Sequence, residues 1–583
     1  MRLSRTRLFM STILLGLFAL CPAAAAHSEI TGFGSHGPDG LRRDTEPDKL
    51  EKSIRKIIKR IAAATVRVDT ADGMGSGTII DAEGHIITSA HVVEGGRRVT
   101  VTLTDGRRFA ARVLGINSAG DLALLDIDAD NLNTVPVGDS DGLKSHQWVI
   151  AAGHPVSAFH DFQPTVSIGL IRQVDATIKA DRNKEFHGTI VSDTPLSPGS
   201  SGGGLFDLKG RLVAINAAVT RNERGAFSVR INEFTKDKKR FLRGDKFDRV
   251  APNIVVSREE RDRTSRTRTQ YFTANCTEIQ KKLAKRQVSM RRGRTRLSGI
   301  IVSSSGDILA PAPLFVNDQP GTLIDVIVDG GKKSGDVARL VAVDQTAGVA
   351  LLRLPNRKEP YSFFDLSIDV QVDRGQLALA KRRDWMTGGI VGSPHRSPPL
   401  EMTDEVYYPH VVQVDLRMFQ SDRGAAVVGL SAELLGMVVQ PRLQVRKKSG
   451  GRYEPAPYGA FLLPVPVLSE SFSLMRRGQS RGVRAVGFLG VELQDMTENQ
   501  KLRYSANSGV RVKRADPGFP AHAAGILRGD IITSIEGLNV NSKGMAVSRI
   551  SSFKSGDKVS VKVKRRGEQR SFQVTLIDRS EIK

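Results

Sequence analysis

The pattern of apolar and polar residues predicts one helix followed by many short strands. Residues 48–63 carry apolar side chains at positions 50, 54, 57, 58 and 61, which is the spacing of an amphipathic helix. From Val66 onward, short runs rich in Val, Ile and Leu are interrupted by Gly, Asp and Asn every 8–12 residues. Strands at that spacing are typical of an all-β barrel or sandwich.

An internal repeat doubles this β pattern. SGTIIDAEGHII at 76–87 recurs as SGIIVSSSGDIL at 298–309, and three more motif pairs follow in the same order: 111–125 with 338–352, 205–215 with 427–437, and 225–232 with 459–466. Collinear motifs indicate duplication of a whole unit. We therefore predict two β domains of one kind, at 46–245 and 275–478.

The N-terminus indicates export. Residues 1–26 combine three arginines, a short apolar run and an Ala-rich cleavage site, the pattern of a secretory signal peptide. An anchor that is never cleaved is the alternative. Residues 27–45 are Gly-rich and polar, which predicts a flexible lead-in. No other apolar run reaches 18 residues, so we expect an exported protein, periplasmic or secreted, with no stable membrane span after signal removal.

Composition narrows the class of protein. The 583 residues are 40% hydrophobic and 25% charged, which excludes a collagen, a wholly disordered chain and a polytopic membrane protein. The formal net charge is +24, and residues 236–297 alone hold 20 Lys and Arg against 7 Asp and Glu. The solvated part of that stretch predicts a basic linker at 246–274. No recognition motif accompanies the charge, so no nucleic-acid partner is expected.

Three sites in the first repeat carry catalytic chemistry. TSAHVV presents His91 after a β run, AGDLALL presents Asp121, and SPGSSGGGL presents Ser201 in a Gly-rich loop. The chain order His, Asp, Ser is the order of the catalytic triad on chymotrypsin-type double β-barrels. Glycines let the nucleophile loop turn tightly, so the N–H groups of Gly199 and Ser201 are the predicted oxyanion hole.

The second repeat lacks this chemistry. Collinear placement sets Pro313 opposite His91, Val349 opposite Asp121 and Arg423 opposite Ser201. Proline and valine cannot transfer protons, and arginine is permanently protonated. We predict a degenerate, non-catalytic domain. Elsewhere the chain shows no cluster of Cys and His ligands and no phosphate-binding Gly loop ahead of a helix, so neither metal nor cofactor is expected.

Residues 46–245 resemble the HtrA (Deg) serine proteases, through GSGTII, GHIITSAHVV, GDLALLDI and SDTPLSPGSSGGGLFDLKGRLVAIN, and residues 485–583 resemble their PDZ domain. The resemblance implies a mainly β fold: two chymotrypsin-like double β-barrel domains, the second one degenerate, plus a C-terminal PDZ domain. It further implies ATP-independent cleavage of unfolded or misfolded polypeptides, and a homo-oligomer, often a trimer in the family. Ile215, Asn216 and Ala217 resemble a wall of the substrate pocket.

The PDZ-like tail predicts a second binding site. Phe488, Leu489, Gly490 and Val491 occupy the place of the loop that binds a peptide's terminal carboxylate in that family. We expect C-terminal peptides to bind there. The alternative to a protease is a chaperone or peptide-binding scaffold whose protease site is latent; Ser201-dependent cleavage distinguishes the two.

Overall fold

The computed structural model describes residues 46–578, except 71–72, 97, 155–161, 182–183, 198, 220–225, 252–266, 293–294, 316, 329–335, 369, 383–384, 397–410, 441–443, 447–452, 456–458, 481–486, 497–499, 501–503, 505–508, 541–542, 552 and 554. The predicted signal peptide (1–26) and lead-in (27–45) lie outside the described residues. No helix among the described residues is long and apolar enough to cross a membrane.

The chain opens with helix α1 (Pro47–Ala64), the helix predicted from the sequence, and continues into a first barrel. Its strands are β1 (Thr65–Thr70), β2 (Gly73–Ile79), β3 (His85–Thr88), β4 (Val99–Thr102), β5 (Arg108–Asn117) and β6 (Leu122–Ile127), with the short helix α2 (Ala90–Val93) after β3. They pair antiparallel in the order β5-β4-β1-β2-β3-β6, and β5 also pairs with β6, which closes the barrel. Alternating side chains such as Val66 and Val68 fill its interior.

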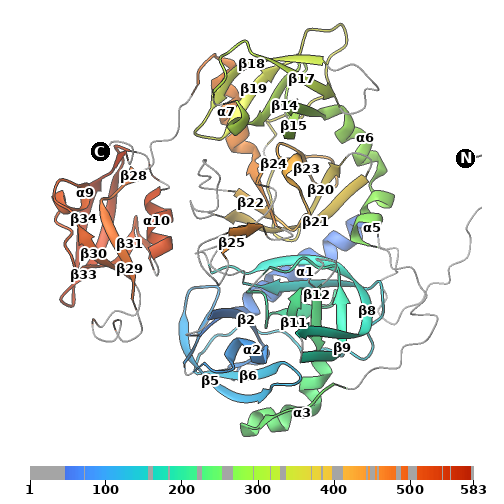
Figure 1. Ribbon diagram of the computed structural model, residues 1–583, viewed down its shortest axis with the longest axis vertical. Coiled ribbons are helices and arrows are strands. Elements are labelled where there is room, and N and C mark those ends of the chain that lie inside the picture. The colour runs from blue at the N-terminus through green and yellow to red at the C-terminus, as the bar shows by residue number, and fades with distance from the viewer. Residues whose placement is uncertain are drawn as a thin grey trace, which may run out of the picture. The chain divides into compact units, whose positions relative to one another are not determined.

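A second closed barrel completes the first repeat (Figure 1). Its strands are β7 (Trp148–Gly153), β8 (Thr165–Asp181), β9 (Lys184–Ser192), β10 (Gly204–Phe206), β11 (Leu212–Val219) and β12 (Ala226–Arg230), hydrogen-bonded in the order β7-β8-β9-β12-β11-β10. Helix α3 (Ile231–Arg243) follows directly and ends at Gly244, which adopts a left-handed φ of 87°.

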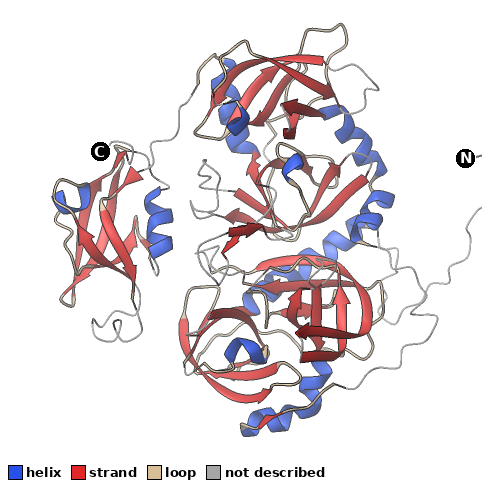
Figure 2. Cartoon of the chain, in the orientation of Figure 1, coloured by secondary structure: helices blue, strands red, loops and turns tan. Residues whose placement is uncertain are grey.

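The second repeat reproduces both barrels (Figure 2). The first contains β14 (Gln287–Arg292), β15 (Thr295–Ile301), β16 (Asp307–Pro311), β17 (Leu323–Val328), β18 (Asp336–Asp344) and β19 (Val349–Arg353). The second contains β20 (Leu377–Arg382), β21 (Trp385–Arg396), β22 (Val411–Val414), β23 (Ala426–Val428), β24 (Leu434–Gln440) and β27 (Ala460–Pro464), with a hairpin of β25 (Gln444–Arg446) and β26 (Tyr453–Pro455). The strands pair in the same relative order as in the first repeat, and helix α7 (Val465–Arg476) follows β27 as α3 follows β12.

The strand register corrects one predicted correspondence. Leu122 opens β6 and pairs with Asn117, while Val349 opens β19 and pairs with Asp344. Val349 therefore corresponds to Leu122, and the placement of Val349 opposite Asp121 is wrong by one residue. Gly348 takes the place of Asp121, and the two share a left-handed φ, 67° and 53°. The loop before each strand has the same length, so the carboxylate is still absent from the second repeat.

The predicted basic linker is structured at both of its ends. Strand β13 (Lys246–Phe247) pairs with β5, and helices α5 (Arg268–Asn275) and α6 (Thr277–Arg286) lead into the second repeat. Arg268 is only 5% exposed, because its guanidinium donates to the buried Asp415 at 2.8 Å and to the Ile168 carbonyl at 2.9 Å. Burial raises the pKa of the Asp415 carboxyl, against the lowering effect of Arg268.

The C-terminal unit has a six-stranded sheet, to which β32 contributes by pairing with β31, and a separate core. It consists of β28 (Gly487–Phe488), β29 (Val491–Asp495), β30 (Val510–Ala515), α9 (Pro520–Ala523), β31 (Ile531–Ile535), β32 (Leu538–Asn539), α10 (Lys543–Ser551), β33 (Lys558–Arg565), β34 (Glu568–Thr575) and β35 (Ile577–Asp578), with β29-β30-β31-β33-β34 as the sheet order. Asp530, 1% exposed, binds Arg565 Nε at 2.6 Å and accepts the Leu527 N–H at 2.9 Å. The predicted mainly β fold with a PDZ domain is confirmed.

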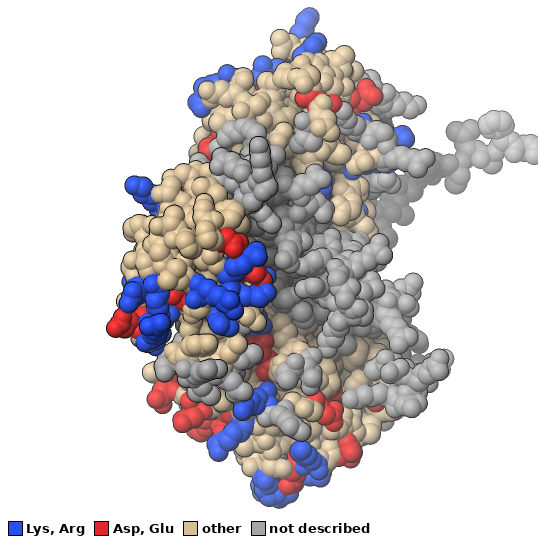
Figure 3. Space-filling view, turned by 60° about the vertical axis from the view of Figure 1, so that its left-hand side comes forward, with Lys and Arg blue, Asp and Glu red and all other residues tan. Residues whose placement is uncertain are grey.

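Surface charge is mixed rather than of one sign. On the face shown in Figure 3, Lys and Arg side chains gather in groups with Asp and Glu beside them. On the C-terminal unit, Lys513 binds Glu492 at 2.6 Å and Arg514 binds Asp516 at 3.2 Å. Exposed pairs of this kind contribute about 0–1 kcal/mol each, so they shape the surface potential more than the stability.

Candidate active site

His91 and Asp121 are hydrogen-bonded to each other in the first barrel. His91 lies in α2, and Asp121 lies in the turn before β6. The fully buried Asp121 carboxylate accepts the backbone N–H of His91 at 3.0 Å, and both of its oxygens lie 2.9 Å from His91 Nδ1. A carboxylate can only accept, so Nδ1 carries the proton and Nε2 remains the basic nitrogen. This is the orientation that a general base requires.

The loop that carries Ser201 is held by the backbone on both sides. The Ser201 carbonyl accepts the Ser76 N–H at 2.8 Å, and the Gly202 N–H donates to the Asn216 carbonyl at 2.7 Å. Gly202 has a φ of 85°, and a Cβ there would lie 2.2 Å from the Ser76 carbonyl oxygen. Only glycine fits. The Gly-rich run is therefore a tightly packed loop and not a flexible linker.

The hydroxyl of Ser201 donates to the carbonyl of Ala217 at 2.7 Å. Within the described residues, no hydrogen bond joins Ser201 to His91. The structure thus assembles the His91–Asp121 pair, and it brings the Ser201 loop beside strands β2 and β11. For His91 to receive the hydroxyl proton, the Ser201 side chain must first leave Ala217.

The predicted oxyanion donors are available. Within the described part of the chain, the N–H groups of Gly199 and Ser201 have no hydrogen-bond acceptor. Gly199 adopts a φ of 95°, which a side chain would strain. Two such unengaged N–H groups beside a serine can stabilise a developing oxyanion.

Two positioning residues were missed by sequence reasoning. Ser76 Oγ donates to the Gly199 carbonyl at 2.7 Å and accepts the backbone N–H of His154 at 2.7 Å. These two bonds hold the carbonyl of Gly199, and the N–H of Gly199 is a predicted oxyanion donor. The available signal was the repeat itself: Ser76 and Ser298 open matching motifs, and both donate their N–H to the nucleophile position, Ser201 or Arg423.

The predicted carboxylate-binding loop of the C-terminal unit lies between β28 and β29. Gly490 has a φ of 77°, and a Cβ there would lie 2.2 Å from Phe519 Cβ. The Phe488 and Phe519 rings meet at 5.8 Å between centroids. Among the described residues, the N–H groups of Leu489 and Gly490 have no acceptor. Val491 begins the strand beside which a peptide strand would add.

Comparisons with known proteins match two parts of the chain. Residues 75–215 match the model of the trypsin-like peptidase domain, and residues 487–576 match that of the PDZ domain. A protein of Halomonas elongata named as a DegP-like periplasmic serine endoprotease is 42% identical over 146 residues, 25% of this chain and 29% of its own. The Synechocystis protein HhoB, named as a serine protease, is 35% identical over 246 residues, 34% of this chain and 58% of its own.

Over these parts, the chain has a trypsin-like peptidase domain and a PDZ domain, and it is similar to DegP-like and HhoB serine proteases. It spans less than two thirds of the length of these relatives. A crystal structure of Deg5 is 25% identical, with a TM-score of 0.30, and covers 33% of this chain and 97% of that one. The peptidase match ends before the second repeat, so the degenerate character of that domain stays a prediction.

The predicted substrate-pocket residues lie on β11. Ile215 and Asn216 are fully buried, and Asn216 is engaged: its Nδ2 donates to the Ala152 and Gly204 carbonyls, and its Oδ1 accepts from Ser228. Ala217, 2% exposed, is the bulge residue whose carbonyl binds Ser201. Their role as a pocket wall stays a prediction.

The second repeat keeps the backbone frame of the Ser201 loop. The Arg423 carbonyl accepts the Ser298 N–H at 2.7 Å. The next residue, Gly424, donates to the Val438 carbonyl at 2.7 Å. These are the two bonds that hold the Ser201 loop, so Arg423 stands where the nucleophile stands in the first repeat. Pro313, in the 3₁₀ turn η1 (Ala312–Leu314), follows β16 as His91 follows β3.

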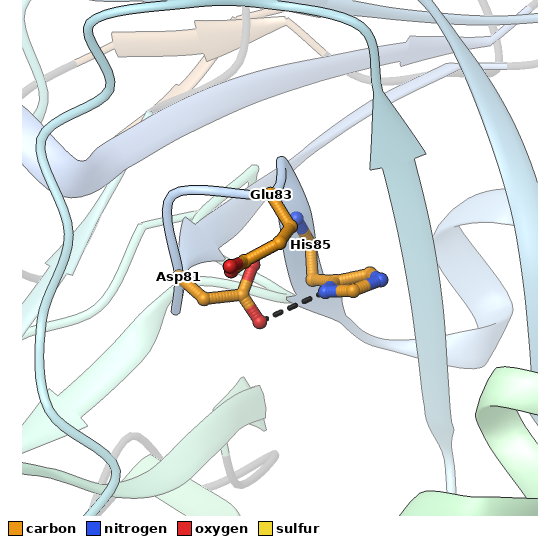
Figure 4. Close-up of side chains that lie close together, drawn as sticks. All are labelled: Asp81, Glu83 and His85. Atoms are coloured by element: carbon orange, nitrogen blue, oxygen red, sulfur yellow. Dashed lines mark hydrogen bonds and ion pairs between the residues drawn. The ribbon is translucent and has the colours of Figure 1, made fainter.

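Asp81, Glu83 and His85 bring ligand-type atoms within 4.8 Å of one another in the turn between β2 and β3 (Figure 4). Asp81 accepts the His85 backbone N–H at 3.1 Å and faces His85 Nδ1 at 2.8 Å. These bonds close the turn and account for the cluster. That the chain uses no metal or cofactor stays a prediction.

The buried His154 should make the protein sensitive to acid. Burial lowers its pKa to about 3, although the Thr65 carbonyl opposes the shift. An unfolded histidine has a pKa of about 6.5. Between these values the unfolded chain binds one more proton, so the free energy of unfolding falls as the pH falls. From this residue we expect a loss of about 2 kcal/mol between pH 7 and pH 5.

Urea unfolding followed by tryptophan fluorescence at pH 7, 6 and 5 measures this loss, since Trp148 lies in the neighbouring strand β7. His154→Gln should flatten the pH dependence, because glutamine does not titrate. The matched control is His395→Gln, at an exposed position, which should leave the profile unchanged. Parallel profiles for the wild type and His154→Gln would contradict the assignment.

Proposed function

We propose that this chain is an exported serine endopeptidase that cleaves unfolded or misfolded polypeptides without ATP. The observation that carries the proposal is the His91–Asp121 pair, with Nδ1 held and Nε2 left basic. A Gly-rich loop with two unengaged N–H groups presents Ser201 nearby. The relatives named as periplasmic serine endoproteases support both the activity and the compartment.

The proposed mechanism uses the triad side chains, two backbone N–H groups and water. The Ser201 hydroxyl turns from Ala217 toward His91 Nε2 and attacks the scissile carbonyl while His91 takes its proton. The N–H groups of Gly199 and Ser201 stabilise the oxyanion, and Asp121 stabilises the imidazolium. His91 then protonates the leaving amine, and an activated water hydrolyses the acyl-enzyme.

A labelled fluorophosphonate tests whether this site assembles. The reagent phosphonylates a serine only when a base and an oxyanion hole activate it. We expect one modified residue, Ser201, when the labelled full-length chain is digested and mapped by mass spectrometry. Label on a serine of the second repeat would overturn the assignment of catalysis to the first repeat.

A latent protease acting as a chaperone or peptide-binding scaffold is the second candidate. The bond between Ser201 and Ala217 favours it, because the hydroxyl donates to a backbone carbonyl in place of its base. Labelling only after addition of an unfolded protein or a peptide would show that the site is latent but competent. Absence of Ser201 label under both conditions would favour the scaffold.

We predict that the PDZ unit binds the C-termini of peptides. Its loop offers N–H donors for an anion, so calorimetry on the full-length Ser201→Ala chain should show binding of a peptide with a free C-terminus. The amidated twin should bind at least about tenfold more weakly, because a charge-assisted hydrogen bond is lost. Equal affinity for the two peptides would remove the carboxylate-capture model.

Gly490→Glu should abolish this binding. Because any Cβ at position 490 meets Phe519, Gly490→Ala is the matched variant that separates crowding from charge. The two variants should lose affinity together if loop geometry decides, whereas a larger loss in Gly490→Glu indicates repulsion of the carboxylate.

We further propose a homo-oligomer, in line with the family resemblance.

A further inference from the structure

The second repeat keeps a pocket at the place of the missing triad. A cavity of about 470 Å³ opens between its two barrels, lined by residues that include Arg296, Pro313 and Arg423. Moving back by the repeat offset of 222 residues, its lining falls on 73–75, 89–92 and 198–201 of the first repeat, the segments that hold His91 and Ser201. The pocket is therefore the counterpart of the catalytic cleft.

The lining has two chemical halves. Leu297, Pro311, Pro313 and Leu314 give an apolar wall, and Pro311 and Pro313 lack the backbone N–H that other residues would carry. Arg296 and Arg423 give a cationic wall. A cavity of this volume is in the range of small-ligand sites, which is enough for two or three residues of a peptide.

A third guanidinium adjoins the two that line the pocket. Arg296 on β15 lies directly opposite Arg291 on β14, so like charges adjoin along this edge. A pocket lined by two guanidinium groups favours an anion, and a planar guanidinium pairs best with a carboxylate.

We propose that this pocket binds a peptide carboxylate beside an apolar side chain. The nucleophile position has become an anchor: Arg423 holds the carboxylate, Arg296 adds a second donor, and the proline and leucine wall takes the apolar side chain. The carboxylate comes either from a C-terminus or from an internal Asp or Glu. The second repeat would thus be a peptide-binding domain, independent of the chemistry at Ser201.

Fluorescence polarisation with the full-length chain tests the proposal. The parent protein carries Ser201→Ala and Gly490→Glu, so that neither cleavage nor the PDZ loop contributes. Three fluorescein-labelled alanine-rich hexapeptides ending in leucine serve as probes: one with a free C-terminus, one amidated, and one amidated with an internal glutamate. Tighter binding of the first probe, the third or both over the second identifies the source of the carboxylate.

Arg423→Gln and Arg296→Gln should each weaken the carboxylate probes, Arg423→Gln by at least about tenfold, and leave the uncharged probe unchanged. The matched control is Arg339→Gln, at an exposed position on β18 of the same barrel. A photoreactive group on the leucine end should cross-link to 295–297 or 311–314.

Thermal melts show whether each variant is folded. If Arg423→Gln does not fold, the affinity of the Arg296→Gln variant tests the proposal by itself, because Arg296 is exposed. Equal affinity for the charged and uncharged probes would overturn the proposal. So would unchanged affinity of the carboxylate probes for the folded arginine variants.

Discussion

Replacement of Ser201 by alanine is expected to lower kcat/KM for casein by about 10⁴-fold or more. Serine supplies the only nucleophile of the proposed mechanism, and removal of one triad member leaves only the contribution of the oxyanion hole and substrate binding. The surrounding loop should survive, because its bonds to Ser76 and Asn216 are made by the backbone. The measurement is the initial rate of casein cleavage at saturating and limiting substrate.

His91→Ala should cause a loss of similar size, and the double variant should be no worse than either single one, since the triad acts as a unit. Ser431→Ala, at an exposed position of the second repeat, is the matched control and should keep the wild-type rate. Additive losses for Ser201→Ala and His91→Ala would mean that the two residues act in separate steps.

Fold and site differ in how far the sequence predicts them. The β pattern and the repeat predict the barrels, because motifs such as those at 76–87 and 298–309 encode the same strands and turns. The His91–Asp121 contact follows from the chain order of the triad on this kind of barrel. Both inferences rest on local patterns that many residues share.

Single contacts between distant residues escape such reasoning. Arg268 stands in a run of charges that predicts a solvated linker, yet it is buried because Asp415, 147 residues away, meets it. Ser76 and His154 fix Gly199 through bonds that no spacing reveals. The Ser201 hydroxyl donates to the Ala217 carbonyl and not to His91. The sequence does not predict this side-chain conformation.

For the second repeat, the sequence predicts which residues are missing but not which structural features remain. Collinear spacing predicts that the triad is missing from the second repeat, and register then places Gly348 rather than Val349 at the Asp121 position. What spacing does not show is that the frame around Arg423 and the cavity beside it persist. A lost reaction and a retained cleft are separate properties, because the barrels that shape the cleft have their own cores.

Asp121→Asn is expected to lower kcat by about 10⁴-fold with little change in KM. Asparagine has the same shape, and it tolerates the left-handed φ of 53° at this position. Its amide nitrogen, however, donates where the carboxylate accepts. An amide donor facing His91 Nδ1 requires a bare nitrogen there, so the imidazole carries its proton on Nε2 and cannot accept from Ser201.

This tautomer change can be observed directly. With ¹⁵N-labelled histidine, the His91 ring should show a protonated Nδ1 in the wild type and a protonated Nε2 in Asp121→Asn. The matched control is Asp126→Asn on the same strand, where the carboxylate binds the exposed Arg112; its kcat should stay within about twofold of the wild type, since surface pairs contribute little. If Asp121→Asn lost activity while keeping the wild-type tautomer, Asp121 would act through the charge it places beside the imidazolium and not by orienting His91.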